Sequence, residues 1–105
     1  MSALCQLWLT CADKAEATKI AKALLEKKLV VCAKQTPVSA DFLWKGGIDH
    51  NEEVLLVMDS REDLFEKVEA EVKKLHSYDT FVLHAIPITK VSEAARKWAE
   101  TELCS

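Results

Sequence analysis

Cysteine, histidine and methionine supply the side-chain atoms of this chain that favour a soft or borderline metal ion. These residues are Cys5, Cys11, Cys32, Cys104, His50, His76, His84, Met1 and Met58. The four cysteines form no close pair of the kind that holds structural zinc or works as a redox dithiol. We therefore expect them to be reduced, to form no disulfide and, for the most part, to fill the core.

His76 is the strongest candidate among these donors. It is predicted to lie at the C-terminal end of the second helix of the chain. A histidine at that position can be a metal ligand, and it can equally be a residue that interacts favourably with the negative end of the helix dipole. The position is compatible with both interpretations.

Enzymatic chemistry has little support in the sequence. Nucleophilic catalysis needs a base within reach of Ser, Cys or Thr, and no local motif such as a nucleophile elbow occurs. Both glycines, Gly46 and Gly47, lie in one predicted turn, and the arginines are only Arg61 and Arg96. The chain thus lacks the cradle that binds a transferred phosphoryl group. We expect neither an enzyme nor a nucleotide-binding protein.

Charge and hydropathy argue against two further classes of protein. The net charge is −3, from 14 basic and 17 acidic residues spread along the chain, so nucleic acid is not an expected partner. The longest apolar runs, such as residues 54–58, are far shorter than the roughly 20 residues that span a bilayer. The N-terminal residues 1–6 lack the features of a secretory signal. We expect a soluble, cytoplasmic protein.

The elements that position these residues follow from hydrophobic periodicity. Four short apolar segments are predicted strands, and the first is expected to be covered on both faces: residues 4–10, 29–33, 53–58 and 81–88. Between the second and third segments, Phe42-Leu43-Trp44 leads into Lys45-Gly46-Gly47-Ile48. This Gly-Gly turn signal predicts a long β-hairpin.

Three helices are predicted from capping residues followed by apolar stripes. The starts are Asp13, which can form a capping box with Glu16, then Ser60 and finally Ser92. The order is strand, helix, strand, strand, helix, strand and a terminal helix, which is the order of the ferredoxin-like α+β fold. No repeat, low-complexity tract or linker interrupts it, so a single domain over residues 1–105 is expected.

With these elements the chain resembles the CutA divalent-cation-tolerance family from about Leu7 to Trp98. The residues that carry the resemblance are Thr10, Leu29-Val30-Val31-Cys32 (Leu-Ala-Ala-Cys in the family), Trp44, Gly46, Ile48, Glu53-Val54-Leu55, His76-Ser77-Tyr78 (His-Pro-Tyr in the family), Pro87-Ile88 and Trp98. Their order and spacing together, rather than any single motif, are specific.

The resemblance implies a homotrimer whose long hairpin, here about Phe42 to Leu55, reaches a neighbouring subunit. It also implies a link to tolerance of divalent metals, chiefly copper, and a trimeric architecture similar to that of the PII signalling proteins. The hairpin itself favours an oligomer, because Phe42, Leu43 and Trp44 have too little chain around them to be covered in a monomer. The alternative is that the hairpin folds back over its own sheet.

The resemblance further implies that His76 is a copper ligand, because it occupies the place of the histidine in the family's His-Pro-Tyr. Leu9 occupies the position where some members carry a strand-end cysteine. Cys11 is two residues further on and could replace that ligand, provided that the strand continues past Thr10. Thiolate with imidazole favours Cu(I), so we expect any copper to bind as Cu(I) at His76 and Cys11. Because two ligands do not make a closed site, we expect this binding to be weak.

The sequence departs from the family in a polar pocket. Asp59-Ser60 stands where the family has Lys-Thr, Phe81-Val82 where it has Pro-Glu, and Ala95 where it has a tyrosine. These changes predict a pocket that is altered or idle. Two alternatives stay open, which are a PII-like regulatory or scaffolding trimer that binds a protein or small effector between subunits and, with less support, an acylphosphatase-like enzyme.

Overall fold

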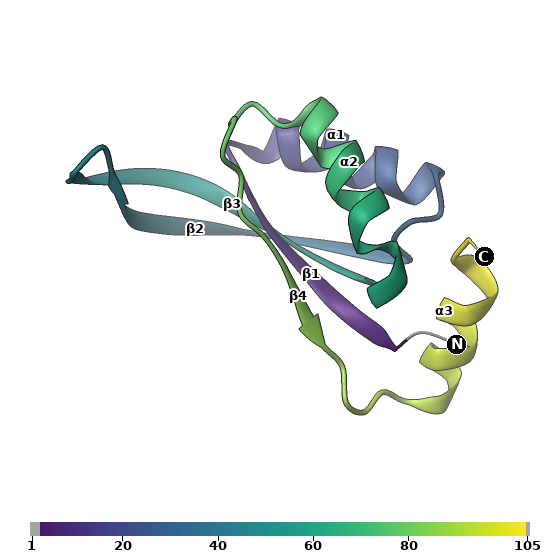
Figure 1. Cartoon of the computed structure of the whole chain (residues 1–105). Helices are drawn as coiled ribbons and strands as arrows, with labels where there is room; N and C mark the ends of the chain where they lie inside the picture. Colours follow the sequence, from purple (N-terminus) through teal and green to yellow (C-terminus); the bar gives the residue numbers. More distant parts are fainter. Residues whose placement is uncertain (1–2, 105) are drawn as a thin grey trace.

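Four antiparallel strands form one sheet, and two helices cover one of its faces (Figure 1). The computed structural model describes residues 3–104. The elements are β1 (Leu4–Cys11), α1 (Lys14–Glu26), β2 (Cys32–Trp44), β3 (Gly47–Arg61), the 3-10 helix η1 (Glu62–Leu64), α2 (Phe65–Leu75), β4 (Leu83–Pro87) and α3 (Glu93–Glu102). The strand order is β2-β3-β1-β4. The predicted ferredoxin-like α+β fold is thereby confirmed.

The core lies between the sheet and the helices α1 and α2. Along β1, Cys5, Leu7, Leu9 and Cys11 alternate with more exposed residues, and all four are fully buried. The helices and β3 contribute further buried apolar residues, which are Ala17, Ile20, Leu24, Leu56, Met58, Leu64, Val68 and Val72. The predicted apolar stripes of the first two helices therefore form the core, except for Leu25 of α1, which is 41% exposed.

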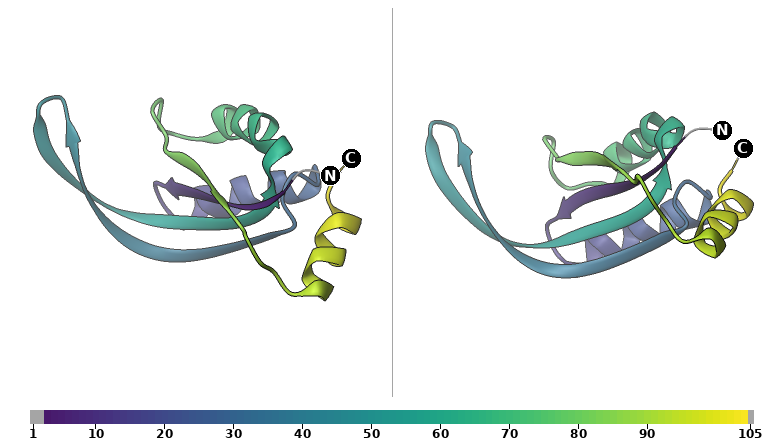
Figure 2. Two further views of the ribbon diagram at one scale, coloured as in Figure 1. Left: turned by 60° about the horizontal axis from the view of Figure 1, so that its bottom comes forward. Right: turned by 90° about the horizontal axis from the view of Figure 1, so that it is seen from below.

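The opposite face of the sheet is open in the single chain (Figure 2). Trp8 of β1 is 37% exposed there, and Ile86 of β4, which pairs with Gln6 of β1, is 38% exposed. The expectation that the first strand is covered on both faces is thus wrong for one chain. Alternation of buried and exposed residues along β1 is typical of a strand with one face on the core.

The β2–β3 hairpin is much longer than its predicted segments. β2 has 13 residues and β3 has 15, and the two stay paired from Cys32–Asp59 to Trp44–Gly47. The turn consists of Lys45 and Gly46, both with positive φ (51° and 82°), as the favoured two-residue hairpin turn requires. The turn is therefore not the predicted Gly-Gly pair. The distal part of the hairpin projects beyond the rest of the molecule, at the end opposite to α3 (Figures 1 and 2).

Two predicted helix starts differ from the structure. Ser60 lies in β3, where its buried hydroxyl donates to the carbonyl oxygen of Leu29 at 2.6 Å, so it caps no helix. The second helix instead begins at Phe65, after η1. Asp13 does cap α1, since its side chain accepts from the N–H of Glu16 at 2.8 Å, and Ser92 occupies the N-cap of α3 without a side-chain hydrogen bond.

Two strand starts also differ. β2 begins at Cys32 rather than Leu29, because Leu29 and Val30 are buried in the connection that leaves α1. β4 begins at Leu83 rather than Phe81. All four cysteines are free thiols. Within residues 3–104, none of the helices has the length and apolar character needed to cross a bilayer.

Candidate functional site

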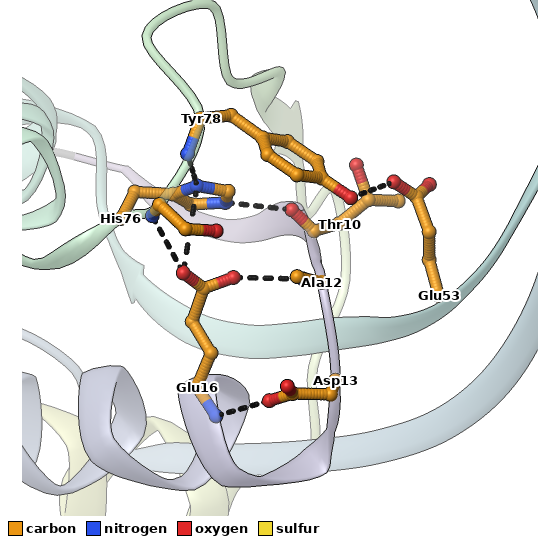
Figure 3. A network of polar contacts seen from close by, with 8 residues as sticks. Thr10, Ala12, Asp13, Glu16, Glu53, His76 and Tyr78 are labelled. Atoms are coloured by element: carbon orange, nitrogen blue, oxygen red, sulfur yellow. Dashed lines mark hydrogen bonds and ion pairs between the residues drawn. The ribbon is translucent and has the colours of Figure 1, made fainter.

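His76 ends α2 and uses both of its ring nitrogens in hydrogen bonds (Figure 3). Nδ1 accepts from the backbone N–H of Tyr78 at 3.0 Å, and Nε2 lies 2.9 Å from the carbonyl oxygen of Thr10. Because Nδ1 acts as an acceptor, Nε2 must carry the hydrogen that it donates to Thr10. The His76 side chain is 0% exposed, and its ring stacks on Phe81 with 5.4 Å between centroids. It is therefore a buried, neutral imidazole that joins the end of α2 to the end of β1.

Glu16 connects the start of α1 to the turn that follows His76. One carboxylate oxygen accepts from the N–H of Ala12 at 2.7 Å, and the other accepts from the N–H of Ser77 at 2.6 Å (Figure 3). Burial acts to raise the pKa of this carboxyl, but the hydrogen bonds from Ala12 and Ser77 outweigh it and lower the pKa. In the predicted capping box Glu16 would bind the N–H of Asp13; the structure shows the N–H of Ala12 instead.

Cys11 is the last residue of β1, so the strand does continue past Thr10 as the predicted ligand pair required. Its sulfur, one carboxylate oxygen of Glu16 and one ring nitrogen of His76 all lie within 4.8 Å of one another. Burial, followed by the negative charge of Glu16, raises the pKa of the Cys11 thiol to about 12. We call these three residues the Cys11–Glu16–His76 cluster. It offers one sulfur, one nitrogen and one oxygen donor.

Tyr78 extends this network to β3. Its hydroxyl donates to Oε2 of Glu53 at 2.7 Å, and its ring lies against His76 with 5.0 Å between centroids (Figure 3). Burial and the hydrogen bond to Glu53 raise the pKa of Tyr78 to about 12. Glu53, although an acidic residue, is only 8% exposed. The network therefore ties together the ends of β1 and α2, the start of α1 and the middle of β3.

The remaining predicted donors lie elsewhere. His50 is on the distal hairpin, His84 pairs with Trp8 on the sheet, and Cys5 is near the opposite end of β1 from Cys11. Met58 is buried in the core, whereas Met1 is outside the described residues. Glu16 was predicted only as a capping residue. Its second role depends on a contact with Ser77, 61 residues away, which no local pattern reveals.

The three departures from the family pattern lie on different segments of the chain. Asp59 lies toward the end of β3 that pairs with the start of β1, and it forms an ion pair with Lys34 at 3.8 Å. Val82 is 50% exposed just before β4, and Ala95 is half-buried on α3. Ser60, the residue after Asp59, has the structural role described above.

The sheet order, the helical layer on one face and the extended central hairpin define a small α+β protein of the ferredoxin-like class. Residues 5–102 match the family described as CutA1 divalent ion tolerance protein, and the chain belongs to this family.

Two curated relatives show how much of the chain is shared. A divalent-cation tolerance protein CutA of Archaeoglobus fulgidus is 36% identical over 94 residues, which cover 90% of this chain and 92% of that protein. The corresponding protein of Pyrococcus horikoshii is 34% identical over 92 residues and covers 88% and 90%, respectively. A solved structure described as the periplasmic divalent cation tolerance protein CutA from Archaeoglobus fulgidus superposes with a TM-score of 0.93 at 34% identity. That superposition covers 94% of this chain and 97% of the other.

Proposed function

We propose that this CutA family member is a cytoplasmic, non-enzymatic trimer that binds a soft metal ion, copper as Cu(I), at the Cys11–Glu16–His76 cluster. The observation that carries the proposal is the convergence of three donor atoms of different type within 4.8 Å, from elements far apart in the sequence. Four free cysteines are consistent with a reducing compartment.

A catalytic role is disfavoured by the state of the same cluster. A thiol beside an imidazole is the arrangement of cysteine nucleophiles, which work because their pKa is lowered. Here burial raises the pKa of Cys11 to about 12, and its side chain is fully buried. The imidazole of His76 is also occupied on both nitrogens. Without a metal, Cys11 and His76 therefore have structural roles. Metal binding would replace the proton of the Cys11 thiol.

The donor types fit Cu(I), but binding must change the existing contacts. The thiol of Cys11 has to lose its proton, and Nδ1 of His76, which lies 3.9 Å from Glu16, has to give up the N–H of Tyr78. Both requirements weaken the affinity at neutral pH. A metal whose binding depends on loss of a proton binds more tightly as the pH rises.

Competition titration with Cu(I) under anaerobic conditions tests the site. We expect His76→Ala and Cys11→Ser to weaken binding by at least about 10-fold, since the loss of even a supporting partner costs roughly 10- to 100-fold at metal sites. The wild-type dissociation constant should fall by about 10-fold per pH unit, because one thiol proton is released.

Cys5→Ser is the matched control. Cys5 lies on the same strand, is equally buried, and has a thiol whose pKa is raised to about 11, chiefly by burial. It is outside the cluster, so its replacement should leave the affinity unchanged. Equal binding by wild type, His76→Ala and Cys11→Ser would place the metal elsewhere, and absence of binding would favour the PII-like alternative.

The trimer is supported by apolar surface that one chain leaves exposed. Leu43 is 79% exposed, Ile48 is 82% exposed and Trp44 is 50% exposed on the distal hairpin. Trp8 and Ile86 add apolar surface to the open face of the sheet. Exposed large apolar residues gathered on one hairpin and one sheet face mark a protein interface. Closed cyclic symmetry is the usual way to bury such surfaces.

Light scattering at micromolar concentration measures the assembly. We expect three times the chain mass of 11.8 kDa for the wild type. The double variant Leu43→Glu, Ile48→Lys should shift the mass toward that of one chain, because it places charges where the apolar pair has to be buried. Leu25→Glu, at an apolar residue of α1 that is 41% exposed, should leave the wild-type mass. A wild-type mass equal to one chain would refute the trimer.

A further inference from the structure

His50 is placed between two carboxylates on the distal hairpin. Its Nδ1 lies 2.6 Å from Oδ1 of Asp41, and its Nε2 lies 2.6 Å from Oε2 of Glu52. A carboxylate can only accept a hydrogen bond, and a neutral imidazole has only one N–H to donate. Both short contacts can therefore be hydrogen bonds only when His50 carries a hydrogen on each nitrogen.

The three residues connect the two strands of the hairpin. Asp41 lies directly opposite His50 in the pairing of β2 with β3, and Glu52 lies two residues further along β3 on the same face. Ser39 lies opposite Glu52 on β2, and its hydroxyl donates to Oε1 of Glu52 at 2.9 Å. Four side chains thus form one continuous hydrogen-bonded row across the ribbon. We call Ser39, Asp41, His50 and Glu52 the hairpin clamp.

The position of the clamp matters for the tip of the hairpin. Leu43 and Ile48 form the next cross-strand pair on the same face, one step closer to the turn, and both side chains are almost fully exposed. Cross-strand side-chain contacts stabilise a two-stranded ribbon, so the clamp contributes to the order of the segment that presents Leu43 and Ile48.

We propose that the hairpin clamp is a proton-dependent switch, in which the imidazolium of His50 locks the distal hairpin and its release of a proton loosens the segment that presents Leu43 and Ile48. The proposal rests on the contacts within one chain and is independent of metal binding at the Cys11–Glu16–His76 cluster.

The direction of the pH dependence follows from the groups that face His50. These are Asp41 from β2 and, from β3, Glu52 and Asp49, whose carboxylate accepts the backbone N–H of His50 at 2.9 Å. The hydrogen bonds to Asp41 and then Glu52 raise the pKa of His50, and those from Ser39 and then His50 lower the pKa of Glu52. A raised histidine pKa means that the stabilisation is complete below the unfolded value, about 6.5, and is lost as the pH rises through the folded value. The lowered pKa of Glu52 keeps its carboxylate ionised down to acidic pH.

Nitrogen-15 NMR of the imidazoles tests the switch in the full chain, which has only three histidines to assign. We expect both ring nitrogens of His50 to keep the imidazolium shift above pH 6.5, with a titration midpoint above that of free histidine. Asp41→Asn and Glu52→Gln should each shift this midpoint downward. Hydrogen exchange of the backbone amides in residues 39–52, corrected for intrinsic rates, should accelerate as the wild type passes through the midpoint.

Asp49→Asn is the matched control, because it removes one negative charge next to His50 without removing a ring contact. It should shift the midpoint less than either clamp variant. A wild-type His50 midpoint at the value of free histidine would overturn the proposal. A midpoint shift in Asp49→Asn as large as in Asp41→Asn or Glu52→Gln would also overturn it, because it would show that nearby negative charge in general, and not the two ring contacts, sets the midpoint. Exchange rates that do not change through the midpoint would also overturn it.

Discussion

Replacement of Glu16 by alanine is expected to lower the free energy of unfolding by about 2–4 kcal/mol, because two hydrogen bonds to a charged acceptor contribute about 1.5–3 kcal/mol each and water recovers part of the loss. Its carboxylate accepts from Ala12 and Ser77, which belong to the start of α1 and to the turn after α2. Removal leaves two backbone donors without their partner. Urea denaturation at equal subunit concentration measures the difference.

The pH dependence of stability distinguishes the effect of the negative charge of Glu16 from the effect of its size and shape. The pKa of Glu16 is lowered in the folded state, since the hydrogen bonds from Ala12 and Ser77 outweigh the opposing effect of burial. Its contribution is therefore present above the unfolded value of about 4.3 and is lost as the pH falls through the folded value. The difference in the free energy of unfolding between wild type and Glu16→Gln should therefore become smaller at acidic pH. Glu26→Gln, at an exposed glutamate of the same helix, should change stability by less than about 0.5 kcal/mol. A difference that is constant with pH would contradict the assigned role.

Replacement of Arg61 by methionine is expected to cost about 1–3 kcal/mol of stability, the range for a buried polar group left without its hydrogen-bond partner. The Arg61 side chain is only 7% exposed. Its Nε donates to Asp63 at 2.6 Å, and its Nη2 donates to the carbonyl oxygen of Cys104 at 2.7 Å. The second bond fastens the segment after α3 to the end of β3. Amide hydrogen exchange in α3 should therefore accelerate in this variant.

Arg96 provides the comparison for Arg61. It is the only other arginine of the chain and is exposed on α3. Arg96→Met removes the same charge and adds the same side chain, yet it should stay within about 0.5 kcal/mol of the wild type, as surface substitutions do. Similar losses in both variants would mean that net charge, and not the bond to Cys104, explains the effect.

Most of the fold could be predicted from periodicity, because the strands and helices have apolar faces of the expected spacing. The exceptions have specific physical causes. Ser60 has the pattern of a helix cap with Asp63 three residues later, but β3 continues through it on the buried face, where its hydroxyl finds the carbonyl of Leu29. Local capping patterns cannot show that a strand continues into the core. The open face of β1 could not be predicted either, since an apolar run does not say which side a helix covers.

The candidate site was predictable only in part. His76 and Cys11 could be named from the resemblance to the family, and the structure brings them together with Glu16. Two of the hydrogen bonds that close the cluster, from His76 to Thr10 and from Ser77 to Glu16, join residues that are distant in sequence. The sequence pattern contains no information on which ring nitrogen of His76 accepts and which donates.

The hairpin clamp shows how one residue in a turn decides which charges meet. With a turn at Gly46-Gly47, Asp41 would face Glu52, and two like charges would oppose each other. The observed turn at Lys45-Gly46 shifts the pairing so that Asp41 faces His50. A two-residue turn fixes the register of the whole ribbon. The clamp therefore could not be predicted from composition, although all of its members were visible in the sequence.

The central place of β1 in the sheet has a consequence for the order in which the protein folds. Its partners are distant in sequence, since Leu4 pairs opposite Arg61 and Cys5 opposite Pro87. The β2–β3 hairpin closes over a two-residue turn, and hairpins form within about 1–10 μs. Contacts of long sequence separation form much more slowly, because the closure entropy of the intervening chain is lost first. Because β1 precedes the other three strands of this sheet along the chain, it waits on the ribosome for β4 before the sheet is complete.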